Sequence, residues 1–427
     1  MKKLIALLLC LLMILCCFTG CKKDEVQTEE QTTVETDGTS EEETADETAE
    51  TEEDTLAGQT LTVYTDLTEE APAYAVYMEQ VTKFEEANGC TVTVNHYGKD
   101  LALVLDNALK NGSAVDVFPV ATLSELSMRA SYALDLSEHA DELEETAYAI
   151  CLDQVKALSG GEKIYAVPTV PSVHAMWYNK ASFEKAGIKE APTSVKEFEA
   201  VCDELVEAGF QPIALDSAYV SSNFAVHMER ALGAQTVAEL VANGGWANNK
   251  KAAEACQTLI DWVDKGYFDE NAPADWPFSQ LSLADRTVMI FADTMTLDMA
   301  EEMIGTDLEW GCFAYPGDSK AVQADFAALC INAETAVPEL AWEFVRFMTA
   351  GEADQAVSDA AGIAPADRNN TSETYGEMTA IAAQADALCD YNNMLKGSVD
   401  LTDVIKNIYA GTYATGEEAV AALDALY

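Results

Sequence analysis

The stretch Lys163-Ile-Tyr-Ala-Val-Pro-Thr-Val-Pro-Ser-Val-His-Ala-Met-Trp-Tyr-Asn-Lys180 decides the fold, because it predicts a strand that leaves one lobe, crosses a hinge and enters another. Its β-prone start, Ile164 to Val167, is interrupted by Pro168 and Pro171. Proline is tolerated at strand ends and crossovers but not inside a central ladder. The apolar run Val173 to Tyr178 predicts a second strand. We therefore expect the hinge at the two prolines.

Two helices are predicted directly after this stretch. The first covers Ala181 to Ala186 and ends at Gly187, since glycine adopts the left-handed conformation easily. The second is capped by Thr193 or Ser194, and Glu197 lies at capping-box spacing from Ser194. Its apolar residues recur with helical period and form one face: Val195, Phe198, Val201, Cys202 and Leu205.

The segment before the quoted stretch alternates strands with helices, which is typical of a doubly wound, mainly parallel α/β sheet. The predicted strands and helices are Leu61 to Thr65, Tyr74 to Phe84, Thr91 to Tyr97, Leu101 to Asn111 and Asp116 to Val120. Ligands of such sheets bind beyond the carboxyl ends of the strands. The loops Asp66 to Thr68 and Ala121 to Ser124 are therefore candidate ligand-binding loops, with Asp66 and Thr122 as candidate contacts.

The chain after the quoted stretch is mainly helical up to Asp269, with loop-like interruptions at Gly244 to Trp246 and Asn271 to Pro277. Thr287 to Phe291 predicts a buried strand. A second crossover is expected near Val322 to Asp325. The strand Phe326 to Ile331 and an amphipathic helix built on Leu340, Phe344, Val345 and Met348 follow it.

Length and charge narrow the class of protein. A chain of 427 residues predicts about two globular lobes. The formal net charge of −50 argues against nucleic acid, against electrostatic docking on anionic lipid and against an anionic ligand. The same charge is also consistent with a simpler role in solubility.

The N terminus predicts a secretion signal followed by a tether. Lys2 and Lys3 precede the apolar run Leu4 to Phe18, which is shorter than a membrane span of about 20 residues and suits a signal peptide over residues 1–20. Phe18-Thr-Gly-Cys21 resembles a bacterial lipobox, so Cys21 is the expected lipidation site. Residues 22–58 are rich in Thr, Glu and Asp and predict a disordered linker with a span of roughly 30 Å.

The cysteines and histidines show no spacing typical of a disulfide framework or a metal site. Cys202 and Cys256 fall at apolar helical positions, which favours core packing over redox chemistry. The histidines His96, His139, His174 and His227 lie far apart in the sequence. Because the chain has neither a nucleophile elbow nor a phosphate-binding loop, we predict no catalytic residue, no metal and no cofactor.

Several motifs together resemble family-1 extracellular solute-binding proteins of ABC transporters, a family with many sugar-binding lipoproteins. These motifs cover most of residues 59–427 and are Lys163 to Pro168, Trp177 to Lys180, Phe183 to Gly187, Ala191 to Ser194, Phe344 to Met348 with Ala353 to Gln355, Gly362 to Ala366, and Gly411 to Ala419.

The resemblance implies a two-lobed, periplasmic-binding-protein-like fold of type II whose sheets are joined by a multi-segment hinge. A third crossing near Gly351 then gives lobe one as residues 59–170 and 325–350, and lobe two as residues 171–324 and 351–427. It also implies a monomer, lipid-anchored outside the bacterial membrane, that captures a solute by hinge closure and delivers it to the permease subunits of an ABC importer.

A neutral mono- or oligosaccharide is the ligand that the resemblance implies, held by aromatic platforms and polar side chains. Trp177 and Tyr178 alternate on one strand; we assign Tyr178 to the core and leave Trp177 as either core or platform. Trp262 and Trp342 are assigned to the core, because they occur at apolar helical positions. The candidate contacts are Asp66, Thr122, Ser172, Trp177, Trp246, Trp276, Asp293, Thr294 and Met295.

Two of these positions depart from the pattern of sugar-binding relatives. Ser172 stands where some relatives place an acidic contact, and Met295 stands where many have a tryptophan. A nontransporting solute sensor, a binder of a cationic solute such as a polyamine, and a secreted glycosidase with a hidden carboxylate pair therefore stay open as alternatives.

Overall fold

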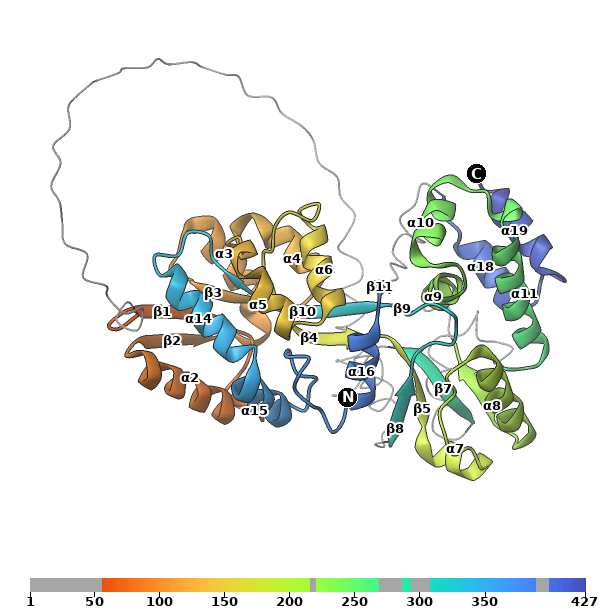
Figure 1. The fold of residues 1–427 in the computed structure, drawn as a ribbon, viewed down its shortest axis with the longest axis horizontal. Helices are drawn as coiled ribbons and strands as arrows, with labels where there is room; N and C mark the ends of the chain where they lie inside the picture. The colour runs from red at the N-terminus through yellow and green to blue at the C-terminus, as the bar shows by residue number, and fades with distance from the viewer. Residues whose placement is uncertain (1–55, 216–219, 269–285, 293–307, 389–398) are drawn as a thin grey trace, which may run out of the picture. The chain divides into compact units, whose positions relative to one another are not determined.

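The computed structural model describes residues 56–215, 220–268, 286–292, 308–388 and 399–427. The strands of its first sheet are β1 (Thr60–Thr65), β2 (Thr91–His96), β3 (Val117–Val120), β4 (Val167–Val173) and β10 (Ala324–Ile331). Their order is β2-β1-β3-β10-β4 (Figure 1). β1 is parallel to β2 and β3, whereas β10 is antiparallel to β3 and β4. The sheet is thus mixed rather than mainly parallel, because the returning strand β10 enters between β3 and β4.

Helices cover both faces of the first sheet. Helices α2, α14 and α15 pack against one another, and α3, α4 and α6 contact the strands. Their bounds, with that of the short helix α5, are α2 (Tyr74–Asn88), α3 (Leu101–Asn111), α4 (Leu123–Arg129), α5 (Ala140–Thr146), α6 (Ala149–Ala157), α14 (Pro338–Met348) and α15 (Gly351–Ala361). In the core, the ring centroids of Phe84 and Phe344 lie 5.3 Å apart in an edge-to-face pair. Trp342 is buried here, as predicted.

A second, four-stranded sheet has the order β6-β7-β5-β8. Its strands are β5 (Ala175–Asn179), β6 (Gln211–Ala214), β7 (Thr287–Ala292) and β8 (Trp310–Phe313). The accompanying helices are α7 (Lys180–Ala186), α8 (Val195–Glu207), α9 (Val220–Leu232), α10 (Ala234–Asn243), α11 (Lys250–Asp264), α18 (Thr402–Tyr409) and α19 (Gly416–Asp424). Trp262 is completely buried in this second core, as predicted.

The helix ends that follow the quoted stretch agree with their sequence signals. Gly187 ends α7 at a φ of 83°, in the left-handed region. The Ser194 hydroxyl caps α8 by accepting from the backbone N–H of Glu197 at 3.3 Å. The return bond of the capping box goes instead to the neighbouring residue, since the Glu197 carboxylate accepts from the backbone N–H of Thr193 at 2.9 Å.

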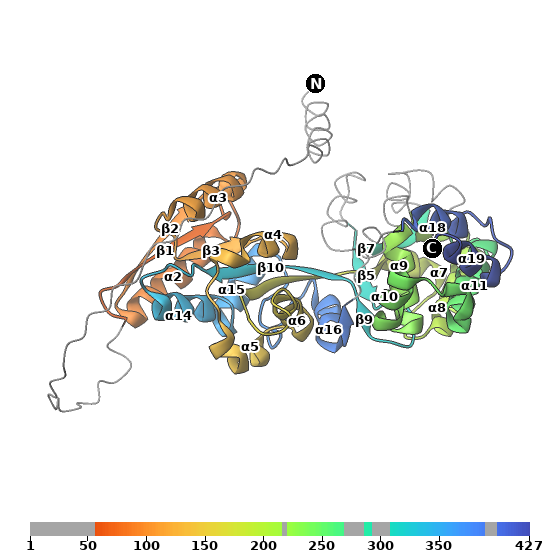
Figure 2. The same ribbon diagram turned by 90° about the horizontal axis from the view of Figure 1, so that it is seen from above.

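Two segments of the chain cross side by side between the lobes. One crossing runs from β4 through His174 into β5, and the other from β9 (Ala321–Val322) through Gln323 into β10. The backbone N–H of His174 donates to the Gln323 carbonyl at 2.8 Å. This hydrogen bond links the two crossing segments at the residue where each passes from one strand to the next. Figure 2 shows β10 running from the first sheet toward β9.

The two crossings are thus linked at His174 and Gln323, a few residues beyond Pro168 and Pro171, where the sequence predicted the hinge. Both prolines belong to β4, which among the described strands is an edge strand paired with β10 alone. An edge strand has one side free of ladder hydrogen bonds, so it tolerates residues without an N–H. The side chain of Gln323, 1% exposed, also donates from Nε2 to the Ser222 carbonyl of α9 at 2.8 Å, which ties this crossing to the second lobe.

The segment after α14 corrects the predicted lobe boundary at Gly351. Helix α15 packs on α2 and α14, and the Asp354 carboxylate accepts from the backbone N–H groups of Ala366 and Asp367 at 2.9 and 3.0 Å. α16 (Gly376–Gln384) then contacts both β4 and β8, and β11 (Ala387–Leu388) pairs with β9. Residues 351–361 thus pack with lobe one, and the chain passes to the second lobe after α16.

Six cysteines lie within the described ranges, and all are buried free thiols. Burial raises the pKa of the Cys256 and Cys151 thiols to about 12, so these groups stay protonated at neutral pH. No helix of the described residues is long and apolar enough to span a membrane.

Candidate ligand-binding site

A cavity of about 470 Å³ opens at the carboxyl ends of β1 and β3 in lobe one. Its polar lining includes Asp66 directly after β1, and Glu125 and Arg129 on α4. Backbone and apolar groups of β10 and β4 complete the wall, among them Ala327 and Thr169. The cavity therefore occupies the edge of the sheet where the strand order predicted ligand-binding loops.

Tyrosine rings surround the Asp66 side of this cavity. Tyr64 and Tyr77 line it, and the ring of Tyr97 packs edge-to-face on Tyr64 at a centroid distance of 4.8 Å. Burial, and then the charge of Asp66, raise the pKa of the Tyr77 phenol far above its usual range. Burial and a hydrogen bond with Tyr97 likewise raise the pKa of Tyr64. These neutral phenols supply aromatic faces together with hydroxyl groups that both donate and accept.

The loop between Asp66 and the next helix is also held in place. The Thr65 hydroxyl accepts from the backbone N–H of Leu67 at 3.1 Å, and the imidazole Nδ1 of His96 lies 2.9 Å from the Leu67 carbonyl. His96 packs in turn against the ring of Tyr74 at 5.0 Å. Asp66 therefore projects from a loop that β2 and α2 both support.

The first turn of α4 forms the opposite wall. The Thr122 hydroxyl accepts from the backbone N–H of Glu125 at 3.2 Å and so caps the helix. The Glu125 carboxylate accepts from the backbone N–H of Ala121 at 3.2 Å and is paired with Arg129 at 3.2 Å. Arg129, whose side chain is 7% exposed, also bonds Asp106 of α3 at 3.0 Å. The arginine charge is thus neutralised by two carboxylates and is not a free anion-binding group.

Ser172 is half-buried on β4, directly opposite the exposed Asp325 of β10 in the antiparallel register. The Asp325 carboxylate oxygen Oδ1 accepts from the backbone N–H of Leu123 at 3.1 Å, at the start of α4. The sequence pointed to Ser172 and placed Asp325 only at the end of a crossover. The signal that could have found Asp325 is a lone acid at the start of a strand whose later residues alternate apolar and small.

The structure places the remaining predicted contacts as follows. Asp66 lines the cavity, and Thr122 contributes a helix cap beside it. Trp177 is 3% exposed and donates from its indole Nε1 to the Ala292 carbonyl at 3.0 Å, so it is a core residue that supports the end of β7. Tyr178, assigned to the core, is instead half-buried and stacks on Phe183. Trp276, Asp293, Thr294 and Met295 lie outside the described residues, and so does Cys21.

Trp246 is the clearest correction among the predicted platforms. It is completely buried in the second-lobe core, with its ring centroid 6.3 Å from that of Phe224. The Asp424 carboxylate of α19 accepts from the backbone N–H groups of Gly245, Trp246 and Ala247 at 2.7, 2.7 and 2.9 Å. This clamp folds the Gly-Gly-Trp segment inward, so its indole cannot reach a ligand.

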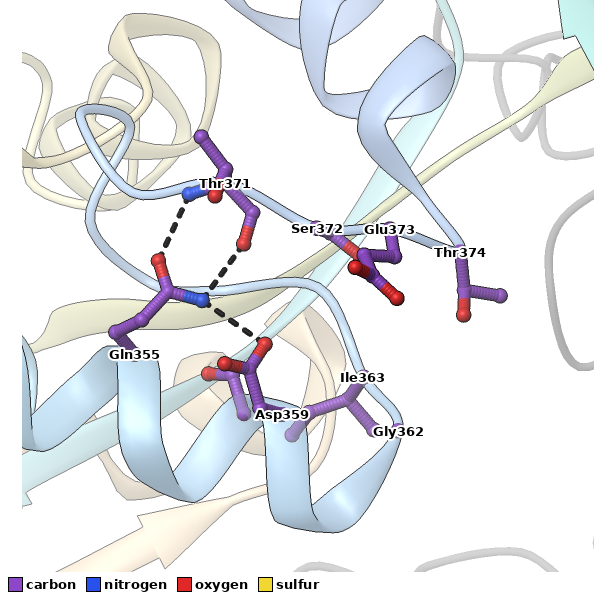
Figure 3. A pocket seen from close by; sticks show the side chains of 9 residues that line it. Gln355, Asp359, Gly362, Ile363, Thr371, Ser372, Glu373 and Thr374 are labelled. Atoms are coloured by element: carbon purple, nitrogen blue, oxygen red, sulfur yellow. Dashed lines mark hydrogen bonds between the residues drawn. The ribbon is translucent and has the colours of Figure 1, made fainter.

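A second cavity of lobe one, of about 580 Å³, adjoins the first at Ile363. It lies between the end of α15 and the loop 371–374 (Figure 3). The Gln355 amide fixes that loop, since Nε2 donates to the Thr371 carbonyl at 2.8 Å and Oε1 accepts from the Thr371 N–H at 2.9 Å. Hydroxyls and carboxylates form its polar lining, and no aromatic ring is among the residues that line it.

A cavity of about 400 Å³ lies between second-lobe residues and the end of α16, and one of about 210 Å³ occurs in the second lobe. His227 lines the smaller one and is fully buried, with Nε2 3.0 Å from the Ala255 carbonyl and Nδ1 3.3 Å from the Tyr315 hydroxyl. Burial lowers the His227 pKa to about 4, so the imidazole is neutral at physiological pH. Among the residues that the structure describes, no group of three or more His, Cys, Asp or Glu could hold a metal ion.

Two α/β sheets joined by paired crossing strands, with a polar and aromatic cavity at the carboxyl ends of the first sheet, are the features of a two-lobed solute-binding protein. A family model described as bacterial extracellular solute-binding protein matches residues 79–382. The chain belongs to this extracellular family. No curated protein matches the sequence.

Solved structures of other solute-binding proteins share the fold. The apo form of RafE from Streptococcus pneumoniae is 20% identical, with a TM-score of 0.65 over 87% of this chain and 97% of that one. The bacterial solute receptor AcbH is 15% identical, with a TM-score of 0.64 over 86% and 97% of the two chains. A probable secreted solute-binding lipoprotein from Streptomyces coelicolor is 18% identical, with a TM-score of 0.64 over 86% and 98%.

Proposed function

We propose that this solute-binding protein captures a neutral mono- or oligosaccharide and delivers it to the permease of an ABC importer, without a chemical step. The observation that carries the proposal is the cavity at the carboxyl ends of β1 and β3, where the rings of Tyr64 and Tyr77 lie beside the carboxylate of Asp66. Aromatic faces suit the apolar surfaces of a sugar ring, and carboxylates and phenols suit its hydroxyls.

The ligands of two similar structures support the same class of solute. RafE has been solved in complex with raffinose, and AcbH is described as having an exclusive substrate preference for β-D-galactopyranose. Two cations line this cavity: the buried Arg129, which is already paired with Asp106 and Glu125, and the exposed Lys99. A carboxylated or phosphorylated sugar would find only the exposed Lys99 as a cationic partner among the residues that line the cavity.

Calorimetry with raffinose, galactose, cellobiose, glucuronate and spermidine tests this function. We expect a neutral sugar to bind near micromolar affinity, which corresponds to about 8 kcal/mol. Asp66→Asn should weaken that binding about tenfold, since a hydrogen bond to a charged group is lost. Glu69→Gln, which alters an exposed acid outside the cavity lining, is the matched control. A response to spermidine alone would refute the carbohydrate assignment.

The polyamine reading is the second candidate, and one observation favours it. The cavity lining holds the carboxylates of Asp66 and Glu125, in a chain with a formal net charge of −50. A cationic solute would then pair with Asp66, since Glu125 is already bonded to Arg129, while its methylene groups packed on the tyrosines. The same panel separates the two ligands, because only the polyamine would bind more weakly as salt concentration rises.

We also propose that the mature chain begins at a lipidated Cys21 and is held at the outer face of the cell membrane. Support comes from the lipobox-like Phe18 to Cys21 and from the acidic residues 22–58 that separate it from the first strand. Cys21→Ala should release the protein into the medium, because lipid chains provide the only anchor in this proposal. Mass spectrometry of the membrane fraction checks it, and an unmodified mature N terminus retained there would contradict it.

A further inference from the structure

We propose that Asp325 is a specificity-determining ligand contact at the hinge edge of the lobe-one cavity. This inference rests on the proposed function and names the group that would read one end of the ligand. In the antiparallel register of the two crossing strands, Asp325 of β10 stands directly opposite Ser172 of β4. Directly opposed residues of an antiparallel pair point to the same face, with Cβ atoms about 5 Å apart.

That face is the one that lines the cavity. Along β10, the more accessible residues alternate with buried ones, and Ala327 and Leu329 of the accessible set line the cavity. Asp325 is the next accessible residue toward the hinge, about 7 Å beyond Ala327 and past the register shift between Phe326 and Ala328. It is exposed, whereas its neighbour Phe326 is buried on the other face. Asp325 therefore lies at the rim of the cavity.

The Asp325 carboxylate is held at one oxygen only. Oδ1 accepts from the backbone N–H of Leu123 at 3.1 Å and from the backbone N–H of Phe326 at 2.8 Å. Oδ2 accepts no hydrogen bond from any residue within the described ranges. One oxygen thus fixes the orientation of the group, and the other is left as an acceptor for a hydroxyl or ammonium of the ligand. A charge-assisted bond from a preoriented carboxylate is stronger than one from a neutral group.

The position also connects the ligand to the hinge. Asp325 lies two residues from Gln323, which the second-lobe helix α9 holds through Ser222. A ligand bound to Oδ2 would therefore touch lobe one at the point where the crossing strand leaves it. Asp66, at the far side of the cavity, would hold the other end of the same ligand.

Asp325→Asn and a double variant test the inference on the full chain, with calorimetry against raffinose, galactose, cellobiose and spermidine. The asparagine keeps Oδ1 as the acceptor for the Leu123 N–H, so the melting temperature should be unchanged. The affinity for the saccharide that the wild type binds most tightly should fall at least tenfold. Glu69→Gln, which alters an exposed acid outside the cavity lining, should bind like the wild type. Combining Ser172→Asp with Asp325→Ser moves the carboxylate across the strand pair on the same face, and should recover part of the lost affinity.

The outcomes separate this inference from the proposed function. If the wild type binds a saccharide and a folded Asp325→Asn binds it equally well, Asp325 is not a contact, although the carbohydrate assignment stands. If the wild type binds spermidine alone and Asp325→Asn weakens that binding, the carbohydrate assignment fails while Asp325 is confirmed as a contact. A wild type that binds no member of the panel overturns both.

Discussion

Trp246→Ala is expected to lower the free energy of unfolding by about 3–5 kcal/mol, the usual cost of truncating a buried aromatic side chain to alanine. The indole has no exposed surface and packs near Phe224 in the second-lobe core. Its backbone is clamped by Asp424, so the loop cannot collapse into the space that the indole leaves. The ligand affinity of the folded variant should be unchanged, because the side chain faces the core.

Thermal and urea unfolding followed by far-ultraviolet circular dichroism measures the first effect, and calorimetry well below the melting temperature measures the second. Trp246→Phe is the matched control. It keeps an aromatic ring and removes an indole N–H that is buried without a hydrogen-bond partner among the described residues, so the loss should be well below that of alanine. An alanine variant that is as stable as the wild type but no longer binds ligand would contradict this prediction and indicate that Trp246 contacts the ligand.

Arg129→Met is expected to destabilise lobe one by about 2–3 kcal/mol. Breaking a fully buried ion pair costs about 3–5 kcal/mol, and the value is lower here because both partner carboxylates reach solvent. The methionine retains the apolar stem but removes the bonds to Asp106 and Glu125. Since Glu125 also holds the Ala121 N–H at the start of α4, the cavity wall should loosen and ligand affinity should fall as well.

Arg346→Met is the control for this effect. Arg346 is half exposed and pairs with Glu343 and Glu142 on the surface of lobe one. Exposed pairs of this kind contribute about 0–1 kcal/mol, so the variant should melt close to the wild type and bind ligand normally. If the two substitutions lowered the free energy of unfolding equally, the buried ion pairs of Arg129 would contribute no more to stability than the exposed pairs of Arg346.

Much of the fold could be predicted because its signals are local. Gly187 ends α7 and Ser194 caps α8, each through a contact within a few residues. The strand β1 and helix α3 likewise follow from alternation and helical period. The point where the two crossings meet could not be predicted from the prolines. Proline is excluded only from central strands, and the sequence does not show that β4 is an edge strand.

The site was harder to predict because its decisive contacts are long-range. Asp66 could be named as a candidate, since it directly follows a strand at the carboxyl edge of the sheet, and it lines the cavity there. Trp246 was misassigned because a Gly-Gly-Trp segment predicts an exposed loop, and the clamping residue Asp424 lies 178 positions away. Arg129 was not singled out, since only the packing of α3 and α4 brings it to the cavity.

The two prolines of β4 have a consequence for how copies of this chain can approach one another. An unpaired edge strand offers a row of N–H and carbonyl groups on which a neighbouring molecule can add its own strand. Pro168 and Pro171 carry no N–H donor, and α6 and α16 contact the same strand. Edge-to-edge aggregation through the first sheet is thereby disfavoured at β4, even where many copies are crowded together.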